Sequence, residues 1–210
     1  MRARRLRSRH VGVPADRTVA ASNLVHSEAF HESVACYDEV ISKMATLPIR
    51  VYPDPILRER AKPVEAITPE LQTLIDDMAE TMYAAPGVGL AANQVGVLLR
   101  VFTVDIANDD EPSDLHVFIN PEIIRKDGEV RWKEGCLSFP HVSETIERAA
   151  SIRVRAMNRK GEVFELDADG LMAVVIQHEN EHLDGKVLLD RLGPVRRRIV
   201  ERKLHKKPPR

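Results

Sequence analysis

The sequence predicts an α+β fold, in which antiparallel β-sheets pack around a central helix and a further helix lies near the C-terminus. Residues 151–157 alternate apolar and polar side chains, and Gly161 then opens a partner segment at 162–166, as expected for a β-hairpin. Residues 71–82 instead carry apolar side chains at three- and four-residue steps, which is typical of a helix with one buried face. A hairpin and helices in one chain indicate a mixed fold.

The first helix has a recognisable start. Thr68 is placed as an N-cap and is followed by proline at the first helical position, so a helix is predicted from residue 69. Its apolar face extends to Tyr83 and ends near Pro86-Gly87. Strand-like segments follow at 98–105, 116–120 and 123–132.

Two helices are predicted after the hairpin. Asp169 is expected to cap a helix over 171–183, which Gly185 ends. A last amphipathic helix spans about 194–204, before a basic tail that ends in prolines and arginine. The apolar run at 171–176 indicates that the first of these two helices is buried, which makes it the central helix of the fold.

The composition excludes several classes of protein. With 210 residues, of which 43% are apolar, the chain fits one soluble domain with a real core, or at most two small ones. It has no run of about 20 apolar residues that would cross a bilayer. Basic and acidic residues number 7 and 5 in 1–46, 16 and 26 in 47–195, and 8 and 1 in 196–210. We therefore expect neither DNA nor a membrane as a partner, although the basic C-terminal end could contact RNA.

The central helix carries the strongest chemical signal, His178-Glu179-Asn180-Glu181-His182. Residues four apart on a helix share a face, so both imidazoles can bind one metal ion while Glu179 lies beside them. A solvated polar face is the alternative interpretation. Because the apolar run at 171–176 leads into the motif, the histidines are expected to be buried, and a metal ion would satisfy them.

A catalytic metal ion needs a third protein ligand, and Cys136 is the best candidate. Its neighbour Gly135 permits close backbone approach, and two imidazoles with one thiolate leave a fourth position open for water. A small buried apolar role is the alternative for any single cysteine, and Cys36 is expected to have that role or to be disordered. On the sequence alone, His116 and His141 also remain possible ligands. Two cysteines make no disulfide framework, which favours a reducing compartment.

Three motifs occur in a fixed order: GVGLAANQ at 87–94, EGCLS at 134–138 and QHENEHLDG at 177–185. Together they closely resemble the peptide deformylases, and the similarity extends from about residue 47 to 204. That family removes the formyl group from the N-terminal formyl-methionine of new polypeptides. The resemblance therefore implies a metallohydrolase that acts on formyl-Met polypeptides and releases formate, with one divalent metal ion, most often Fe²⁺; Zn²⁺, Ni²⁺ or Co²⁺ are possible substitutes.

The resemblance also assigns roles to individual residues. Glu179 would be the general acid/base, and Gln94 and the backbone N–H of Leu137 would donate hydrogen bonds to the developing oxyanion. Gly89 would contact the substrate through its backbone. The metal ligands would be Cys136, His178 and His182.

A methionine pocket and a supporting ion pair are further implications of the resemblance. Glu134 and Arg148 resemble a pair that braces the cysteine loop, whereas Ser143 replaces an arginine found in some members and so puts one further substrate contact in doubt. Core packing is the alternative for the apolar residues. The expected pocket residues are Val88, Trp132, Leu171, Val174 and Val175.

Two other functions compete with this interpretation. A zincin-type peptidase also uses a His-Glu-x-x-His helix, but only His205 follows His182, and the glycine motif and Cys136 would then have no role. A zinc-stabilised RNA-binding module would be expected to fill four protein ligands, whereas the sequence offers three good ones.

The expected organisation has three parts. Residues 1–46 form an arginine-rich N-terminal extension, which is disordered, a presequence, or upstream of a true start at Met44; it lacks the apolar region of a secretory signal. Residues 47–205 form a single catalytic domain, and 206–210 a basic tail. The C-terminal helix and tail are candidates for ribosome contact. We expect a cytoplasmic protein, or a mitochondrial or plastid one if the extension is a presequence.

Overall fold

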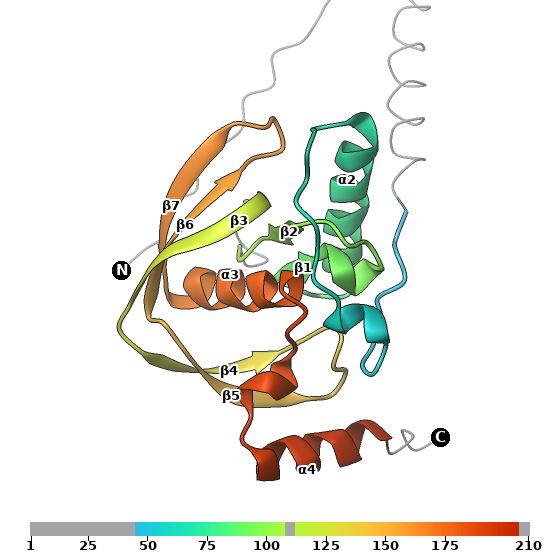
Figure 1. Ribbon diagram of the computed structural model, residues 1–210, viewed down its shortest axis with the longest axis vertical. Helices are drawn as coiled ribbons and strands as arrows, with labels where there is room; N and C mark the ends of the chain where they lie inside the picture. The colour runs from blue at the N-terminus through green and yellow to red at the C-terminus, as the bar shows by residue number, and fades with distance from the viewer. Residues whose placement is uncertain (1–44, 108–111, 206–210) are drawn as a thin grey trace, which may run out of the picture. The chain divides into compact units, whose positions relative to one another are not determined.

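The computed structural model describes residues 45–107 and 112–205 (Figure 1). The predicted extension up to residue 44, with Cys36, lies outside the described residues, and so does the tail 206–210. The α-helices are α2 (Pro69–Ala84), α3 (Gly170–Leu183) and α4 (Pro194–His205). Short 3-10 helices occur at η1 (Pro55–Arg58), η2 (Ala92–Val95) and η3 (Leu188–Arg191). Within the described ranges no helix is long and apolar enough to cross a membrane.

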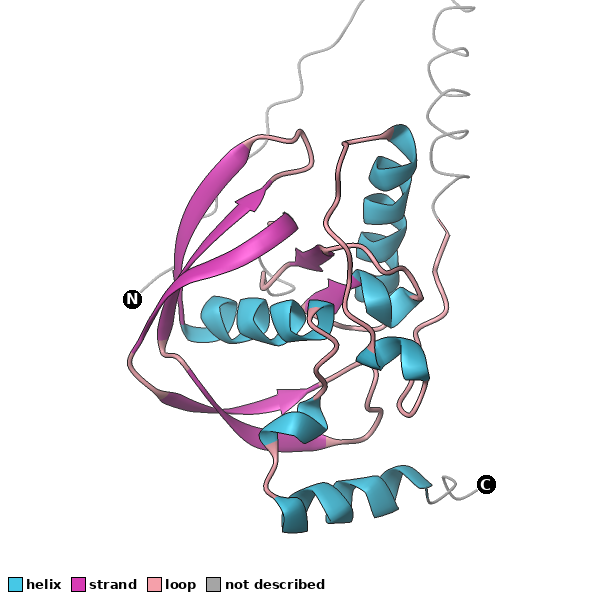
Figure 2. Cartoon of the chain, viewed as in Figure 1, coloured by secondary structure: helices cyan, strands magenta, loops and turns pink. Residues whose placement is uncertain are grey.

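Seven strands form two antiparallel sheets within the described residues (Figure 2). The five-stranded sheet has the order β1-β2-β3-β6-β7, and β4 and β5 form a separate hairpin. This arrangement of helices and antiparallel sheets confirms the predicted α+β fold. The strands are β1 (Gly89–Ala91), β2 (Val101–Val104), β3 (His116–Asp127), β4 (Val130–Gly135), β5 (Ser143–Arg148), β6 (Ser151–Met157) and β7 (Val163–Asp169).

Helix α2 begins where its sequence predicts. The Thr68 hydroxyl accepts a hydrogen bond from the N–H of Leu71 at 3.3 Å, which satisfies one of the free donors of the first turn. The apolar face then buries Ile75, Met78 and Met82 against residues of the first two strands, Leu90 and Val101 among them. The glycine motif of residues 87–94 follows the helix in the sequence, and this packing holds its strand β1 against α2.

Helix α3 occupies the centre of the fold. In Figure 1 it runs between the strands of the five-stranded sheet and the β4–β5 hairpin. Its buried side chains, such as Ala173 and Ile176, pack in one cluster with Phe102 and Phe118 of the sheet. The apolar run that opens the helix therefore anchors it, and its polar second half is held inside the protein.

The β4–β5 hairpin lies on the other side of α3 from the five-stranded sheet (Figure 1). Ile146 of β5 and the fully buried Phe139 share a cluster with Leu188 of η3 and Val200 of α4. Helix α4 thus covers the hairpin with one apolar side, and the end of β4 and the turn after it carry the EGCLS motif.

Two local predictions need correction. The segments 116–120 and 123–132 are not separate strands, because β3 continues through Pro121 to Asp127 and a turn at Gly128, with φ of +62°, separates it from β4. Asp169 occupies the N-cap position of α3, but its side chain makes no capping hydrogen bond. The adjacent Gly170, with φ of +52°, supplies the sharp change of direction from β7 into the helix.

Candidate metal centre and active site

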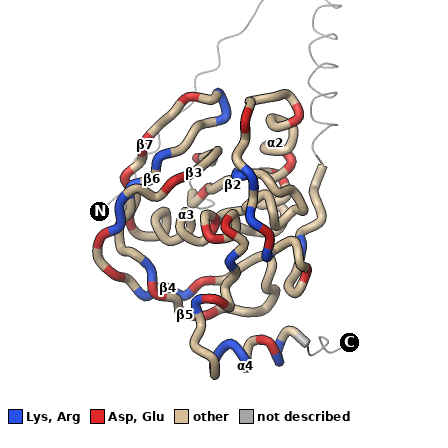
Figure 3. The backbone as a smooth tube through the Cα atoms, viewed as in Figure 1, with Lys and Arg blue, Asp and Glu red and all other residues tan. Residues whose placement is uncertain are grey.

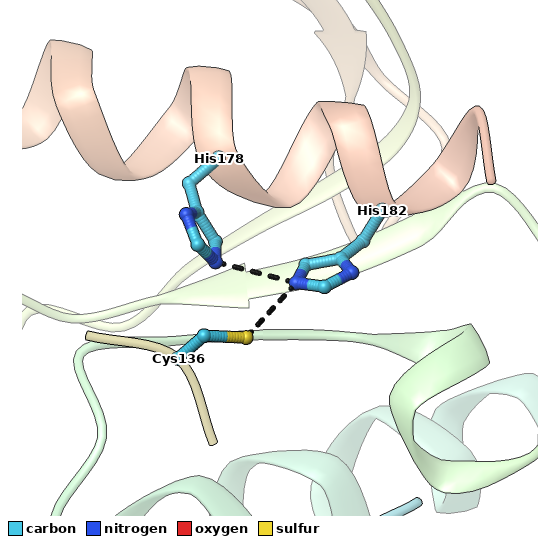
Figure 4. Close-up of side chains that lie close together, drawn as sticks. All are labelled: Cys136, His178 and His182. Atoms are coloured by element: carbon cyan, nitrogen blue, oxygen red, sulfur yellow. Dashed lines mark hydrogen bonds between the residues drawn. The ribbon is translucent and has the colours of Figure 1, made fainter. Parts of the chain in front are cut away.

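Helix α3 and the loop after β4 bring three donor atoms together (Figure 4). The Nε2 atoms of His178 and His182 lie 3.2 Å apart, and the Sγ atom of Cys136 lies 3.2 Å from Nε2 of His182. All three donors lie within 4.8 Å of one another, and both imidazoles are buried. The two histidines, one helical turn apart, therefore share one face of α3, as the sequence predicts. Cys136, which is 42 positions before His178, lies beside them.

The orientation of His178 is set by Glu134. A carboxylate oxygen of Glu134 lies 2.8 Å from Nδ1 of His178 and accepts a hydrogen bond from it, which leaves Nε2 free to face the other donors. Arg148 donates two hydrogen bonds to Glu134, at 2.7 and 2.8 Å. Burial alone would raise the pKa of Glu134, but the hydrogen bonds from Arg148 and His178 lower it to about 2. The carboxylate therefore stays ionised.

Glu181 extends this network toward the surface. Its carboxylate lies 2.8 Å from Nη1 of Arg148 and also pairs with Arg191. Sequence reasoning missed Glu181 as a supporting residue, because its place inside the His178–His182 motif is equally consistent with a solvated position. It missed Asn93 as well, whose side-chain amide donates to the backbone carbonyl of His182.

The donor set fits a divalent transition metal ion. A thiolate and two neutral imidazoles are the ligands such ions prefer, and three protein ligands leave a coordination position for water or substrate. A buried oxygen of a residue that lines the cavity beside the donors, Oε2 of Glu179, lacks a hydrogen-bond partner among the described residues. Polar atoms left in that state are costly, which favours a group bound in this space.

Glu179 directly follows His178 in the sequence, and its carboxyl group is buried in closely packed surroundings. Burial raises its pKa to about 7, against the opposing charges of His178 and Arg148. A Cβ atom on Gly89 would lie 2.7 Å from a carboxylate oxygen of Glu179 and 2.8 Å from Val175. Only glycine fits at that position, so the edge of β1 approaches Glu179 closely.

Gln94 presents its amide to the cysteine loop. Its Oε1 atom accepts the N–H of Ala91 at 2.8 Å, which fixes the side chain so that Nε2 points away from β1. Nε2 lies 3.2 Å from Oγ of Ser138 and 3.6 Å from Sγ of Cys136. Leu137 lies between these two residues, in a turn that the N–H of Phe139 closes onto the carbonyl of Cys136 at 2.9 Å.

A cavity of about 480 Å³ opens onto these groups. Gly89, Gln94, Cys136, His178 and Glu179 are among its lining residues. Its apolar lining includes the residues expected to form a methionine pocket: Val88, Trp132, Leu171, Val174 and Val175.

The two alternative metal ligands lie apart from the three donors. His116 pairs with Asp114 at 2.9 Å at the start of β3. His141 lines the cavity with an exposed side chain, but it does not belong to the donor group. Among the described residues, the geometry leaves Cys136 as the partner of the two histidines.

Comparison with known proteins decides the family. The family model for polypeptide deformylase matches residues 46–198. The chain belongs to the polypeptide deformylase family. Members remove the formyl group from N-formylmethionine polypeptides, and the chain is accordingly a metal-dependent hydrolase. This membership confirms the resemblance and excludes both the peptidase and the RNA-binding module.

Relatives match over almost their whole length. The peptide deformylase of Syntrophobacter fumaroxidans is 51% identical over 164 residues, which cover 78% of this chain and 96% of that protein. The crystal structure of a peptide deformylase from Legionella pneumophila superimposes with a TM-score of 0.73 at 46% identity, covering 76% of this chain and 94% of that one. The deformylase of Ehrlichia chaffeensis in complex with actinonin gives a TM-score of 0.73 at 35% identity, covering 77% and 96%.

Proposed function

We propose that Cys136, His178 and His182 hold the metal ion of this deformylase and that Glu179 is its general acid/base. The observation that supports this most strongly is the convergence of three donor atoms within 4.8 Å, next to the buried carboxyl of Glu179, which lines the same cavity as Cys136 and His178. Formate release from a formyl-Met peptide, measured with the metal content of anaerobically purified protein, tests the proposal. Metal-loaded protein that releases no formate would contradict it.

We propose Fe²⁺ as the native ion, with Zn²⁺, Ni²⁺ or Co²⁺ able to substitute. One thiolate and two imidazoles suit all four ions, and the family resemblance favours iron. When bound, such an ion acts as a Lewis acid that makes hydroxide available near neutral pH. Metal analysis after strictly anaerobic purification distinguishes the four candidates.

In this proposal Glu179 accepts and donates the proton that is transferred in the reaction. It accepts a proton from the attacking water and later passes it to the nitrogen of the leaving amine. A carboxyl whose pKa lies at about 7, raised by burial, can do both near neutral pH. The role is typically worth about 10²–10⁴-fold in rate.

Gln94 and Leu137 are proposed to stabilise the oxyanion that forms on the formyl oxygen. The Nε2 atom of Gln94 and the backbone N–H of Leu137 belong to neighbouring segments, which the contact between Gln94 and Ser138 links directly. An amide donates without carrying a titratable charge. Loss of one such donor costs on the order of 10²–10³-fold in comparable sites.

Substrate recognition is assigned to the cavity walls. Gly89 offers backbone groups at the edge of β1, where a side chain would collide with Glu179. The apolar wall is suited to the methionine side chain, since ligand pockets are mostly apolar with few polar groups. It consists of Val88, Trp132, Leu171, Val174 and Val175.

Glu134 and Arg148 are proposed to support the metal site rather than to react. Both side chains are almost fully buried, and their bidentate contact joins β4, which leads into Cys136, to the end of β5. The same carboxylate orients His178. Removal of either partner would leave a buried charge unpaired, which is strongly destabilising.

The domain proposal makes a prediction about the extension. A chain that starts at Met44 is expected to fold and to release formate from a formyl-Met peptide at the full rate. The reason is that its first contacts, from Ala45 to Asp77 and from Leu47 to Thr81, are retained together with every site residue. Thermal unfolding and formate assays of both chains test this prediction. If the shorter chain does not fold, part of the extension belongs to the catalytic domain, which then begins before residue 47.

The same comparison bears on location. We propose a cytoplasmic protein, with a mitochondrion or plastid as the alternative if residues 1–46 act as a presequence. Full activity of the chain from Met44 is compatible with both. Import assays with isolated organelles distinguish them.

Helix α4 is proposed to contact the ribosome, where new polypeptides emerge. Its Lys and Arg residues, blue in Figure 3, differ in their contacts. Arg196 and Arg197 are paired with Glu144 and Glu201, at 2.6 and 3.1 Å. Arg198 and Arg202 are exposed on the same helix face as Val195 and Ile199. A basic and apolar face of this kind suits a surface that contains RNA and protein.

Neutralising that face is therefore expected to weaken ribosome binding without loss of activity on peptides. Arg198→Gln combined with Arg202→Gln is expected to reduce co-sedimentation with ribosomes, and binding of the unchanged protein is expected to fall as salt rises. Removal of residues 206–210 should act in the same direction. Lys126→Gln on β3 with Lys160→Gln in the turn between β6 and β7 makes the same charge change away from α4 and is the control. If both double variants co-sediment equally with ribosomes, this face of α4 is a solvated surface that does not bind the ribosome.

A further inference from the structure

We infer that Tyr52 is a positioning residue that, through the backbone and ring of the segment before η1, fixes the two oxyanion donors relative to each other. The inference rests on the roles proposed above for Gln94 and Leu137. Tyr52 is not among the residues that line the cavity, so it has no direct contact with substrate in this assignment. Its contacts are with the two segments that carry the donors.

The backbone of residues 50–52 bridges those segments. The N–H of Arg50 donates to the carbonyl of Gln94 at 2.7 Å, and the N–H of Tyr52 donates to the carbonyl of Ser138 at 3.0 Å. One short stretch of chain thus holds η2 and the cysteine loop at the same time. The stretch is itself anchored upstream, where the N–H of Leu47 donates to Oγ1 of Thr81 on α2 at 2.8 Å.

The ring of Tyr52 adds a second contact with the cysteine loop. It stacks on Phe139, with ring centroids 5.1 Å apart and an angle of 21° between the planes. Phe139 is buried, and its N–H closes the turn that contains Leu137. The guanidinium of Arg58, which also pairs with Asp190, lies 5.9 Å from the centre of the Tyr52 ring. The ring is therefore held in place and in turn limits movement of the turn.

The expected effect follows from the sensitivity of preorganised donors to position. A displacement of about 1 Å in a catalytic arrangement can cost on the order of 10²-fold in rate. Loss of the Tyr52 ring frees one side of the turn but leaves the backbone hydrogen bonds, so the effect should be smaller than loss of a donor. We expect Tyr52→Ala to lower kcat about 10- to 100-fold.

The experiment uses the full-length, metal-loaded protein and a formyl-Met peptide. Tyr52→Phe keeps the stacked ring and should stay within about twofold of the parent in kcat, whereas Tyr52→Ala should lose kcat with KM changed less than about threefold, since only the transition state carries the oxyanion. Phe164→Ala is the packing control, because Phe164 makes a tilted ring contact with Phe118 in the sheet, with ring centroids 5.6 Å apart. It should lower the melting temperature without a comparable loss of kcat.

Two further measurements separate positioning from ordinary packing. In Co²⁺-loaded protein, the thiolate absorption band should shift in Tyr52→Ala and not in Phe164→Ala, because the loop of Cys136 moves only in the first. In a double-mutant cycle, Tyr52→Ala should cost less kcat when Gln94 is already alanine, since the two act on one oxyanion site.

The outcomes identify which proposal fails. Unchanged kcat, an unchanged Co²⁺ spectrum and a lowered melting temperature for Tyr52→Ala would make Tyr52 a packing residue and overturn the inference. If Tyr52→Ala does not fold, Tyr52→Leu keeps apolar volume without the stacked ring and is judged by the same criteria. If the parent protein releases no formate, or Gln94→Ala alone changes nothing, the proposed site roles fail first.

Discussion

Glu179→Gln is expected to retain the metal ion and the fold while formate release falls by about 10²–10⁴-fold. The amide has the shape of the carboxyl, so the close approach to Gly89 is preserved. Because burial raises the pKa of Glu179 to about 7, a neutral group in this position is tolerated by the surrounding structure. What the amide lacks is the capacity to accept a proton from water.

The measurement combines metal content, melting temperature and steady-state kinetics. Glu165→Gln, at an exposed position on β7, removes one carboxylate without touching the site and is the control. The loss in the Glu179 variant should appear in kcat, since the proton is transferred in the transition state. Near-normal turnover in a variant with a full complement of metal would refute the general acid/base role.

The parts of the fold that the sequence predicts are those with a local signal. The N-cap at Thr68, the alternation along β6 and the one-turn spacing of His178 and His182 each depend on neighbours within a few positions. The structure places β6 at Ser151–Met157 and ends α3 at Leu183, as predicted. Helix caps, strand alternation and helical periodicity are short-range effects, so they can be read without knowledge of tertiary contacts.

Strands β1 and β5 were not predicted, and β5 shows why. Its buried positions are Glu144, Ile146 and Arg148, so two of the three inward side chains are charged. Such a segment has no apolar alternation. The charges are tolerated because Arg196 and Glu134, both distant in sequence, pair with them. A pattern that depends on remote partners cannot be recognised locally.

The site residues also divide into those that have a local sequence signal and those that do not. The helix spacing predicts two ligands from periodicity alone, whereas the choice of Cys136 over His116 or His141 needed either the family resemblance or the fold. The link between Glu134 and His178 spans 44 positions and has no signal in either segment taken alone. The contacts of Tyr52 with Ser138 and Phe139 are longer-range still, and sequence reasoning missed them.

Cys136→Ser is expected to lower metal occupancy and activity together. A hydroxyl is a far weaker ligand than a thiolate, because it stays protonated at neutral pH and its oxygen is a poorer donor to the borderline metals that imidazoles prefer. The two histidines remain in place, since His178 is oriented by Glu134 and α3 is anchored in the core. The variant should therefore fold and bind the ion weakly.

Titration with Co²⁺ measures this directly. The Cys136 variant should need much more metal to reach the same occupancy, and it should lack the thiolate absorption band at every concentration. Cys36→Ser makes the identical chemical change at the other cysteine and should behave like the parent protein in metal content and formate release. Activity of the Cys136 variant should rise as excess metal fills the site, because Glu179, the proposed general acid/base, is untouched. Metal content and turnover that survive the substitution would show that Cys136 packs beside the histidines without binding the ion.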